Sequence, residues 1–184
     1  MPDSLRSQLR SLPVFAGPLP DFELDSALDD PEELFVEWLE SAIAAGVPEP
    51  HAMSLATVDA GGQPSSRVLV LKDLTAAGWQ FATGRTTRKG RELRATQVAA
   101  LNFYWQQLGR QVRVAGTVIE LTAEESAADF RARPGWSEGA PIDPDWQLYA
   151  IRATEVEFWQ ADRDRHHRRL IYRRAADGWD QHRP

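Results

Sequence analysis

Short strand-like segments, each followed by a turn signal, occupy most of the chain after His51 and constrain its fold most strongly. Ala52–Val58 alternates between apolar and polar residues, and Asp59-Ala60-Gly61-Gly62 after it is typical of a hairpin turn. The other segments that read as strands are 67–74, which we expect to be buried, 79–83, 98–105, 111–121, 148–159 and 170–174. Strands that follow one another in this way favour an antiparallel barrel, and 184 residues suffice to bury its core.

Helices are predicted at the periphery of this barrel. Asp30 is a suitable N-cap for a helix that begins with Pro31 and two glutamates, and Gly46 is suited to end it. The apolar residues of this helix share one face, which is expected to enter the core: Leu34, Phe35, Trp38, Leu39, Ala42 and Ile43. Thr122-Ala123-Glu124-Glu125 is a capping box that starts a short helix ending near Arg131. The predicted fold class is therefore mainly β with peripheral helices.

The chain is expected to hold one domain, residues 31–184, preceded by an irregular N-terminal arm, residues 1–30. Prolines interrupt the arm, and only Ser4–Leu12 has a helical pattern. A loop rich in Pro, Gly and Asp is expected at 134–145, and His182 is expected to lie in a solvated tail.

Several classes of protein are excluded by what the sequence lacks. It has no cysteine, which excludes disulfides, thiolate metal sites and thiol nucleophiles. No apolar stretch reaches the roughly 20 residues of a membrane span, and no signal-peptide core is seen, so the cytoplasm is the expected compartment. Motifs of phosphate-binding loops, serine hydrolases and zinc proteases are absent, and the adjacent His166 and His167 point apart, so no metal site is expected.

Charge is distributed unevenly along a chain whose formal net charge is −6. Residues 1–50 hold eleven acids and two arginines, whereas residues 51–100 hold three acids and seven basic residues. An acidic protein is a poor sequence-independent binder of nucleic acid, but a basic middle segment indicates a localised anion site. Nineteen of the 21 basic residues are arginines, and both lysines, Lys72 and Lys89, lie in this segment.

The segment Gly84–Gly90 has the features of such a site. One of its two threonines is a suitable N-cap for a helix that reaches Ala95, which places Arg88 and Lys89 in the first turn. Cations are unfavourable at this end of a helix unless an anion neutralises them beside the free backbone N–H groups. The segment is therefore either a solvated basic turn or an anion site.

The sequence does not decide the role of three further groups of polar residues. Arg67 and Lys72 bracket an apolar strand and face opposite sides if the strand is unbroken; they either extend to solvent or bind an elongated anionic ligand. Gln111 and Arg113 share one face of a strand and can reach the same cavity. The basic run 163–169 is either an exposed hairpin turn or part of a site.

Taken together, these residues resemble the pyridoxamine/pyridoxine 5′-phosphate oxidase family of flavin enzymes. The resemblance covers residues 31–184, apart from a gap near 138–145. The stretches that carry it are Ala56-Thr57-Val58-Asp59, Gly62-Gln63-Pro64, Arg67–Lys72, Phe81-Ala82-Thr83, Thr87-Arg88-Lys89, Gln111-Val112, Arg133-Pro134, Val156–Gln160 and Arg165–Tyr172.

This resemblance implies an antiparallel split β-barrel that binds FMN and works as a homodimer, with the flavin at the subunit interface. By the family's pattern, Arg67, Arg88 and Lys89 hold the FMN phosphate. The other cofactor-binding positions that it implies are Val68, Leu69, Lys72, Ala82 and Thr83, and, from the partner chain or the opposite wall, Gln111, Trp159 and Arg169. The protein then orients and tunes a cofactor that performs the redox chemistry.

The resemblance also implies a small aromatic substrate whose amine or alcohol carbon is oxidised by hydride transfer to the flavin, with reoxidation by dioxygen. Lys72, Arg133 and Ser137 would bind a substrate phosphate. Arg165 and His167 would lie over the reacting carbon as the catalytic pair, with Arg165 stabilising charge and His167 acting as a polar partner or proton acceptor. Neither nucleic acid nor a membrane is an expected partner.

Two departures from the family's pattern bear on the substrate. Asp129 stands where the family usually has a tyrosine that binds the phosphate, although Arg131 is able to neutralise this carboxylate. Residues that usually follow Ser137 are missing before Trp146. One alternative is therefore an FMN oxidase of another aromatic metabolite, of the phenazine-type branch to which Lys89-Gly90-Arg91-Glu92-Leu93 is similar. A flavin- or pyridoxal-phosphate-binding protein without turnover is another.

Overall fold

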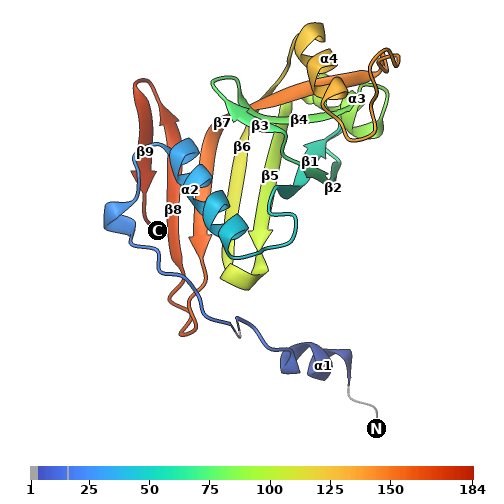
Figure 1. The fold of residues 1–184 in the computed structure, drawn as a ribbon. Helices are drawn as coiled ribbons and strands as arrows, with labels where there is room; N and C mark the ends of the chain where they lie inside the picture. The colour runs from blue at the N-terminus through green and yellow to red at the C-terminus, as the bar shows by residue number, and fades with distance from the viewer. Residues whose placement is uncertain (1–3, 16) are drawn as a thin grey trace.

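A computed structural model describes residues 4–15 and 17–184 of the protein, and strands dominate it (Figure 1). The helices are α1 (Leu5–Ser11), α2 (Pro31–Ala44), α3 (Arg88–Thr96) and α4 (Ala123–Arg131), with short 3-10 turns η1 (Leu24–Ser26) and η2 (Gln106–Leu108). The strands are β1 (Ala52–Val58), β2 (Pro64–Val70), β3 (Asp73–Thr75), β4 (Gly78–Gly84), β5 (Val98–Trp105), β6 (Arg110–Glu120), β7 (Trp146–Gln160), β8 (Arg168–Ala175) and β9 (Gly178–His182).

All strand pairings are antiparallel, in the order β2-β1-β5-β6-β7-β4-β3, with β8 and β9 added beside β7. The long strand β7 joins the two parts of the sheet, because its beginning pairs with β4 and its end pairs with β8. Three of the helices lie at the edges of this sheet or on it (Figure 1). The predicted fold class, mainly β and antiparallel with peripheral helices, is confirmed.

The helix α2 carries its apolar face into the core, as its sequence predicts. The Asp30 carboxylate accepts a hydrogen bond from the Glu32 N–H (2.7 Å), which caps the helix. Phe35 is fully buried, and the ring of the buried Trp38 meets that of Phe158 edge-on, with centroids 5.1 Å apart. These aromatic contacts fix α2 against the strands that form the rest of the core.

The predicted buried strand 67–74 is instead two separate strands, β2 and β3. β2 is an edge strand that pairs only with β1, and Val68 is 68% exposed. Lys72 N–H donates to the Gln80 carbonyl oxygen (2.8 Å), so the chain has by then left β1 for β4. Apolar composition does not distinguish an edge strand from a central one. The prediction that Arg67 and Lys72 face opposite sides of one strand therefore does not apply.

Two smaller predictions are also wrong. His182 belongs to β9, not to a tail, because β9 pairs with β8 and the Trp179 ring lies 3.8 Å from the Arg174 guanidinium. Ile43 is 59% exposed. At 3.6 residues per turn it lies half a turn around the helix from Leu34, which is outside the buried face.

The N-terminal arm lies along the C-terminal strands. The carbonyl oxygens of Phe22 and Leu28 accept hydrogen bonds from the Arg168 guanidinium and from the Tyr172 hydroxyl, both at 2.6 Å. Phe22 also packs edge-on against Trp38, with ring centroids 4.8 Å apart. The second half of the arm is thus anchored to β8 and α2, whereas α1 in its first half buries no residue.

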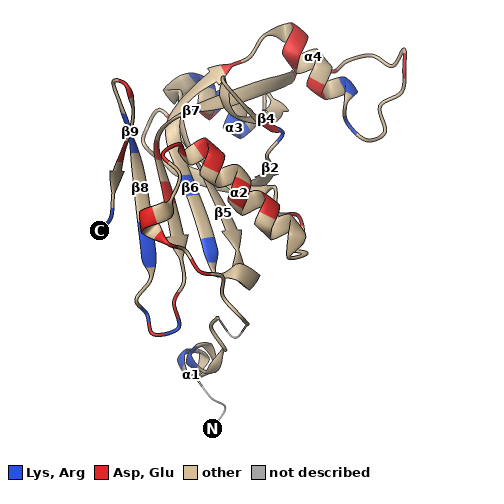
Figure 2. Ribbon diagram, turned by 60° about the vertical axis from the view of Figure 1, so that its left-hand side comes forward, with Lys and Arg blue, Asp and Glu red and all other residues tan. Residues whose placement is uncertain are grey.

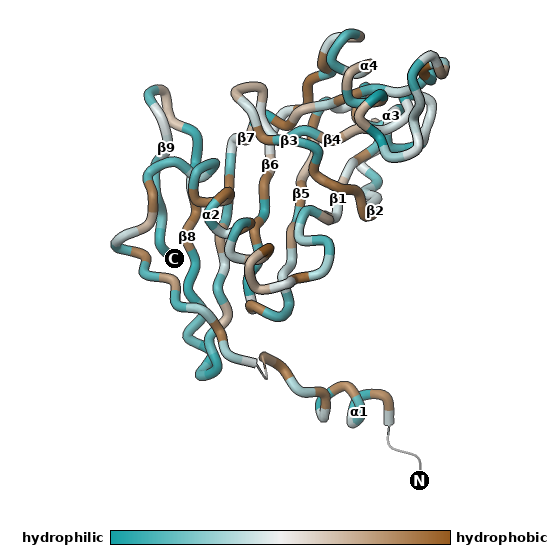
Figure 3. Tube along the Cα trace, in the orientation of Figure 1, coloured by the Kyte–Doolittle hydropathy of each residue, from teal (hydrophilic) through white to brown (hydrophobic). Residues whose placement is uncertain are grey.

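Charged and hydrophobic residues gather on different elements of the fold. Acidic residues lie along α2 and basic residues on α3 (Figure 2), and hydrophobic residues run through β5 and β6 (Figure 3). In the part of the chain that the structure describes, no helix is both long and apolar enough to span a membrane. Within the same residues, no group of three His, Asp or Glu side chains is placed to hold a metal ion.

Candidate functional site

Three cations gather at the beginning of α3, and we call them the cradle: Arg67, Arg88 and Lys89. Thr87 is the N-cap of α3, and its hydroxyl accepts a hydrogen bond from the Gly90 N–H (3.2 Å). Arg88 and Lys89 follow in the first turn, and Arg67 reaches them from β2. Burial and the neighbouring Arg67 lower the pKa of Lys89, and none of the ion pairs among residues 4–15 and 17–184 involves Lys89. The structure therefore brings together the three residues predicted to hold a phosphate.

The strand β4 leads directly into the cradle. Ala82 and Thr83 are buried in it, and the Thr83 hydroxyl lies 3.5 Å from the hydroxyl of Thr87. A Cβ added to Gly90 would lie 2.5 Å from the Gly84 carbonyl oxygen. Glycine at this position is what lets α3 start so close to the end of β4.

Val68 and Leu69, both predicted to line the flavin, point to opposite faces of β2. Leu69 packs against the core, whereas Val68 is exposed. A single ligand that contacts both residues must therefore contact their backbone atoms in β2, not both side chains.

A second group of predicted residues forms a row across β6, β7 and β8. Gln111 is the register partner of Trp159, and Trp159 is the register partner of Arg169. The Gln111 amide donates to the Asn102 side-chain oxygen (2.7 Å), and Arg169 Nε lies 3.4 Å from the Glu157 carboxylate. Directly opposed residues share one face of a sheet, so the three side chains form one surface.

This row and the cradle lie on opposite faces of the sheet. Arg67 is paired with Leu55, whose side chain is fully buried on the core side. Gln111 precedes Val112, which is also fully buried in the core, so the Gln111 side chain faces away from it. Within one chain, the two groups do not face a common ligand.

The loop between β7 and β8 holds the predicted catalytic pair, Arg165 and His167. The Asp162 N–H donates to His167 Nδ1 (3.0 Å), and the imidazole ring lies 4.9 Å from the Trp159 ring. Arg165 N–H donates to the Asp162 carbonyl oxygen (3.2 Å) in a tight turn. Arg165 has a φ of +66°, a left-handed conformation that costs an L-residue about 1–2 kcal/mol. His167 is linked through Trp159 to the row on the sheet.

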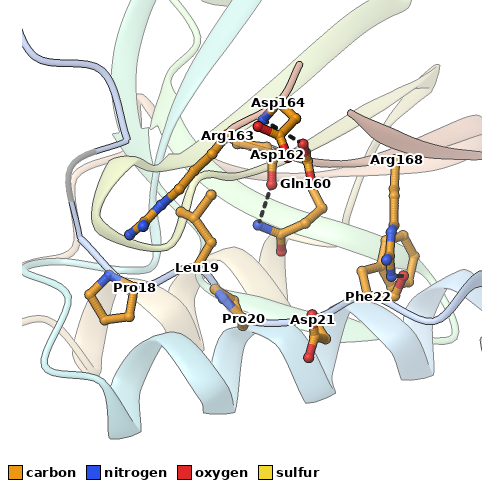
Figure 4. A pocket seen from close by; sticks show the side chains of 11 residues that line it. Pro18, Leu19, Pro20, Asp21, Phe22, Gln160, Asp162, Arg163, Asp164 and Arg168 are labelled. Carbon is orange, nitrogen blue, oxygen red and sulfur yellow. Dashed lines mark hydrogen bonds between the residues drawn. The ribbon is translucent and has the colours of Figure 1, made fainter. Parts of the chain in front are cut away.

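The N-terminal arm packs over this loop, a contact that the sequence analysis did not predict. A cavity of about 570 Å³ is lined by Val14, Phe15, Asp162, Arg163, Arg165 and His167. The Phe15 ring lies 6.0 Å from the Trp159 ring and 6.1 Å from the His167 ring. A second cavity, of about 460 Å³, lies between Pro18–Phe22 and the end of β7 (Figure 4). The signal in the sequence was an apolar pair, Val14-Phe15, between prolines.

The predicted substrate residues Lys72 and Arg133 meet around Asp129. Lys72 Nζ lies 3.8 Å from Asp129 Oδ1, and Trp146 Nε1 donates to Asp129 Oδ2 (2.8 Å). The Arg133 guanidinium lies 4.4 Å from the centre of the Trp146 ring, a cation–π contact. The residue that neutralises Asp129 is therefore Lys72, and the expectation that Arg131 does so is wrong.

The substrate cluster around Asp129 is far from the catalytic pair within one chain. The cluster contacts the first residue of β7, whereas the catalytic pair follows its last residue. β7 has 15 residues, which span roughly 45 Å along the strand. Figure 1 shows α4 and the β7–β8 loop at opposite ends of the fold. Ser137, the third predicted phosphate ligand, is exposed in the loop after α4.

Two descriptions of known families match this chain. Residues 39–160 match the family described as pyridoxamine 5′-phosphate oxidase, and residues 146–183 match the pyridoxine 5′-phosphate oxidase C-terminal dimerisation region. The chain belongs to the pyridoxamine 5′-phosphate oxidase family. The resemblance drawn from the sequence is confirmed, and so is the prediction of an FMN-dependent oxidoreductase at the level of the family. The matched dimerisation region contains Trp159, Arg169 and the predicted catalytic pair.

Curated relatives of this oxidase family match most of the chain. The pyridoxine/pyridoxamine 5′-phosphate oxidase of Bordetella petrii is 40% identical over 178 residues, which cover 80% of this chain and 85% of the relative. The enzyme of the same name from Thermosynechococcus vestitus is 38% identical over 186 residues, which cover 84% and 88%.

Solved structures agree on the fold of this oxidase family. PhzG from Burkholderia lata, solved with tetrahydrophenazine-1-carboxylic acid, has a TM-score of 0.85 at 29% identity and covers 91% of this chain and 99% of PhzG. A pyridoxamine 5′-phosphate oxidase-related, FMN-binding protein from Nostoc punctiforme has a TM-score of 0.70 at 17% identity, with 84% and 96% covered. The split barrel predicted for this chain is confirmed.

Proposed function

We propose that the protein is an FMN-dependent oxidase that acts on a pyridoxamine- or pyridoxine 5′-phosphate-type substrate, as a homodimer with FMN at the interface. The observation that carries this proposal is the cradle. It places Arg67 beside Lys89, although burial and the repulsion from Arg67 lower the pKa of Lys89. Cations are held together in this way where an anion neutralises them.

The residues at the cradle fit the phosphate of FMN. A phosphate monoester carries about −1.5 to −2 charges at pH 7 and accepts several hydrogen bonds. Arg88, Lys89 and the first N–H groups of α3 are suitable donors for it. Ala82 and Thr83, at the end of β4 beside the cradle, carry small side chains.

The homodimer follows from the position of the remaining predicted residues. The row of Gln111, Trp159 and Arg169 faces away from the cradle, and the catalytic pair is a strand's length from Asp129. One small molecule meets all of these groups only if a second copy supplies one set. The match of residues 146–183 to a dimerisation region supports this arrangement.

The geometry of the catalytic loop favours one of the two roles predicted for His167. FMN, when bound, supplies the hydride acceptor and passes electrons to dioxygen. Because His167 Nδ1 accepts the Asp162 N–H, its neutral imidazole carries the proton on Nε2 and donates it in a hydrogen bond to the substrate. Arg165 places a permanent positive charge in the same loop and is suited to orient the substrate ring. His167 is thus a polar partner of the substrate.

The alternative function, oxidation of another reduced aromatic metabolite, is supported by the ion pair between Lys72 and Asp129. The carboxylate cancels one of the cations that would bind a substrate phosphate. PhzG, the Burkholderia lata relative, was solved with a tricyclic acid that has no phosphate.

The two functions are separated by anaerobic reduction of the bound flavin. Pyridoxamine 5′-phosphate is expected to bleach the flavin absorbance of the purified protein, and His167→Asn is expected to slow the bleaching about tenfold or more. His166→Asn, at the exposed neighbouring residue, is the matched control and leaves the rate unchanged.

Other outcomes contradict parts of the proposal. Bleaching by dihydrophenazine-type compounds but not by pyridoxamine 5′-phosphate selects the alternative. A flavin that neither compound bleaches indicates a binding protein without turnover, and a protein that binds no FMN refutes every function that depends on FMN.

A further inference from the structure

A buried carboxylate lies inside the cradle, where an anion is least expected. Glu92 is one turn after Arg88 in α3, and its side chain is 5% exposed. Its Oε1 accepts a hydrogen bond from Arg88 Nε (2.7 Å). Its Oε2 accepts hydrogen bonds from the hydroxyls of Thr57 (2.5 Å) and Ser65 (2.8 Å). All of the carboxylate's partners therefore belong to the walls of the proposed phosphate site.

The same two hydroxyls connect Glu92 to Arg67. Thr57 and Ser65 are register partners on β1 and β2, and each accepts a hydrogen bond of 2.5 Å from the Arg67 guanidinium. Arg67 Nη2 also lies 3.5 Å from Glu92 Oε2. Arg67 is thus held in one orientation by two strands and one carboxylate.

This network leaves the donors that a phosphate needs unused. Arg88 contacts Glu92 only through Nε, and no acceptor in residues 4–15 and 17–184 takes a hydrogen bond from its two Nη groups. In the same described residues, Arg67 Nε is also without an acceptor. Three cations and one carboxylate leave the cradle with a net charge of +2, which matches a phosphate monoester.

Glu92 is ionised throughout the physiological range. The hydrogen bond from Thr57, with smaller contributions from Ser65 and Arg88, lowers its pKa to about 2, although burial alone would raise it. Its charge is therefore a constant part of the cradle.

We propose that Glu92 is a positioning residue of the FMN phosphate site: it fixes Arg67 and Arg88 so that their unused N–H groups remain available to the phosphate. This inference rests on the proposed function, which places the phosphate in the cradle. It assigns a role to a residue that does not itself touch the ligand.

The substitution Glu92→Gln tests this role, because charge and positioning predict opposite changes in the Kd for FMN. Charge alone predicts that removing a negative group from the cradle tightens binding of a phosphate. Positioning predicts the opposite, because the new amide N–H₂ meets the N–H donors of the two arginines, which then lose their fixed orientation. We expect the Kd for FMN to increase about tenfold.

Riboflavin, which has no phosphate, separates positioning from a general structural role. Apo-protein is titrated with FMN and with riboflavin by flavin fluorescence, and the riboflavin Kd of Glu92→Gln is expected to stay within about twofold of wild type. Glu40→Gln, which removes an exposed carboxylate from α2, is the charge control and changes neither Kd. Ser65→Ala, at the edge of the sheet, is a milder variant that weakens FMN alone by about threefold.

Each other result overturns the inference. An unchanged or lower Kd for FMN in Glu92→Gln excludes positioning, and equal weakening of FMN and riboflavin indicates a structural role. If Glu92→Gln does not fold, an unchanged FMN Kd in Ser65→Ala overturns it. If the wild-type protein binds riboflavin as tightly as FMN, the cradle holds no phosphate, and the proposed site fails before Glu92 is tested.

Discussion

Replacing Lys89 by methionine is expected to weaken FMN binding and to stabilise the apo-protein at the same time. Methionine keeps an unbranched apolar side chain of similar length but removes the charge. Lys89 lies half-buried beside Arg67, and no ion pair in the described part of the chain neutralises it. The charge is therefore unfavourable in the empty cradle and favourable when a phosphate occupies it.

The loss of affinity follows from one charge-assisted hydrogen bond. Such a bond contributes about 1.5–3 kcal/mol, so the Kd for FMN is expected to rise about 10- to 150-fold. Coulomb's law gives an upper bound of about 4 kcal/mol for unit charges 4 Å apart near a protein surface. Titration of apo-protein with FMN measures the effect. Arg94→Gln, which removes an exposed cation from the last turn of α3, is the matched control and changes the Kd less than about twofold.

The gain in stability follows from the direction of the pKa shift. Burial and Arg67 lower the pKa of Lys89 below 10.5. Between that lowered pKa and 10.5 the unfolded chain binds more protons than the folded one, so wild-type stability rises with pH across this window. Below the window the charged lysine destabilises the fold by a constant amount, which Lys89→Met removes. A lower Tm of apo-Lys89→Met at pH 7, or an unchanged FMN Kd, would refute the reasoning.

Two further predictions concern the substrate side of the site. Lys72→Ala and His167→Ala are each expected to lose most activity. If each site takes Lys72 from one chain and His167 from the other, a dimer of the two variants has one intact site. Half of the dimers in a co-refolded mixture are of this kind, so the mixture is expected to regain about a quarter of the wild-type rate. No recovery in the steady-state assay would contradict a site shared between subunits. Asp129→Asn is expected to raise the preference for pyridoxamine 5′-phosphate over pyridoxamine about tenfold in kcat/KM, since Lys72 is then free to bind phosphate. An unchanged preference would remove Asp129 from the substrate site.

Elements that depend on neighbouring residues were predicted from the sequence with few errors. The capping box of α4 forms as expected, with the Glu125 N–H bonded to the Thr122 hydroxyl (3.1 Å) and the Thr122 N–H bonded to the Glu125 carboxylate (2.8 Å). The threonine N-cap of α3 and the two cations in its first turn are also found where the sequence predicts them. These features involve residues within four positions of one another, so the sequence contains all of their interactions.

Apart from the burial of Ile43, which is a matter of helical periodicity, the wrong predictions concern interactions across the fold. Arg131 is near Asp129 in the sequence, but residues two apart on a helix point in different directions, and Lys72, between β2 and β3, forms the ion pair. The apolar run of β2 reads as buried, but its place at the edge of the sheet leaves Val68 exposed. The apolar pair Val14-Phe15 gives no information on its partner, so the packing of Phe15 over His167 is decided by the fold, as is the pairing of β9 with β8.

The sequence by itself determined most of the secondary structure, the presence of a basic helix start and the family to which the chain belongs, because each depends on short stretches of neighbouring residues. Only the tertiary structure decided which charges meet. Glu92 is hydrogen-bonded to Thr57 and Ser65, which lie 35 and 27 positions away in the chain, and Asp129 pairs with Lys72 from the connection between β2 and β3. Strand pairing brings such residues within hydrogen-bond distance, and it depends on the register of the whole sheet. The chemistry of the cradle therefore depends on the fold, because its residues are far apart in the sequence.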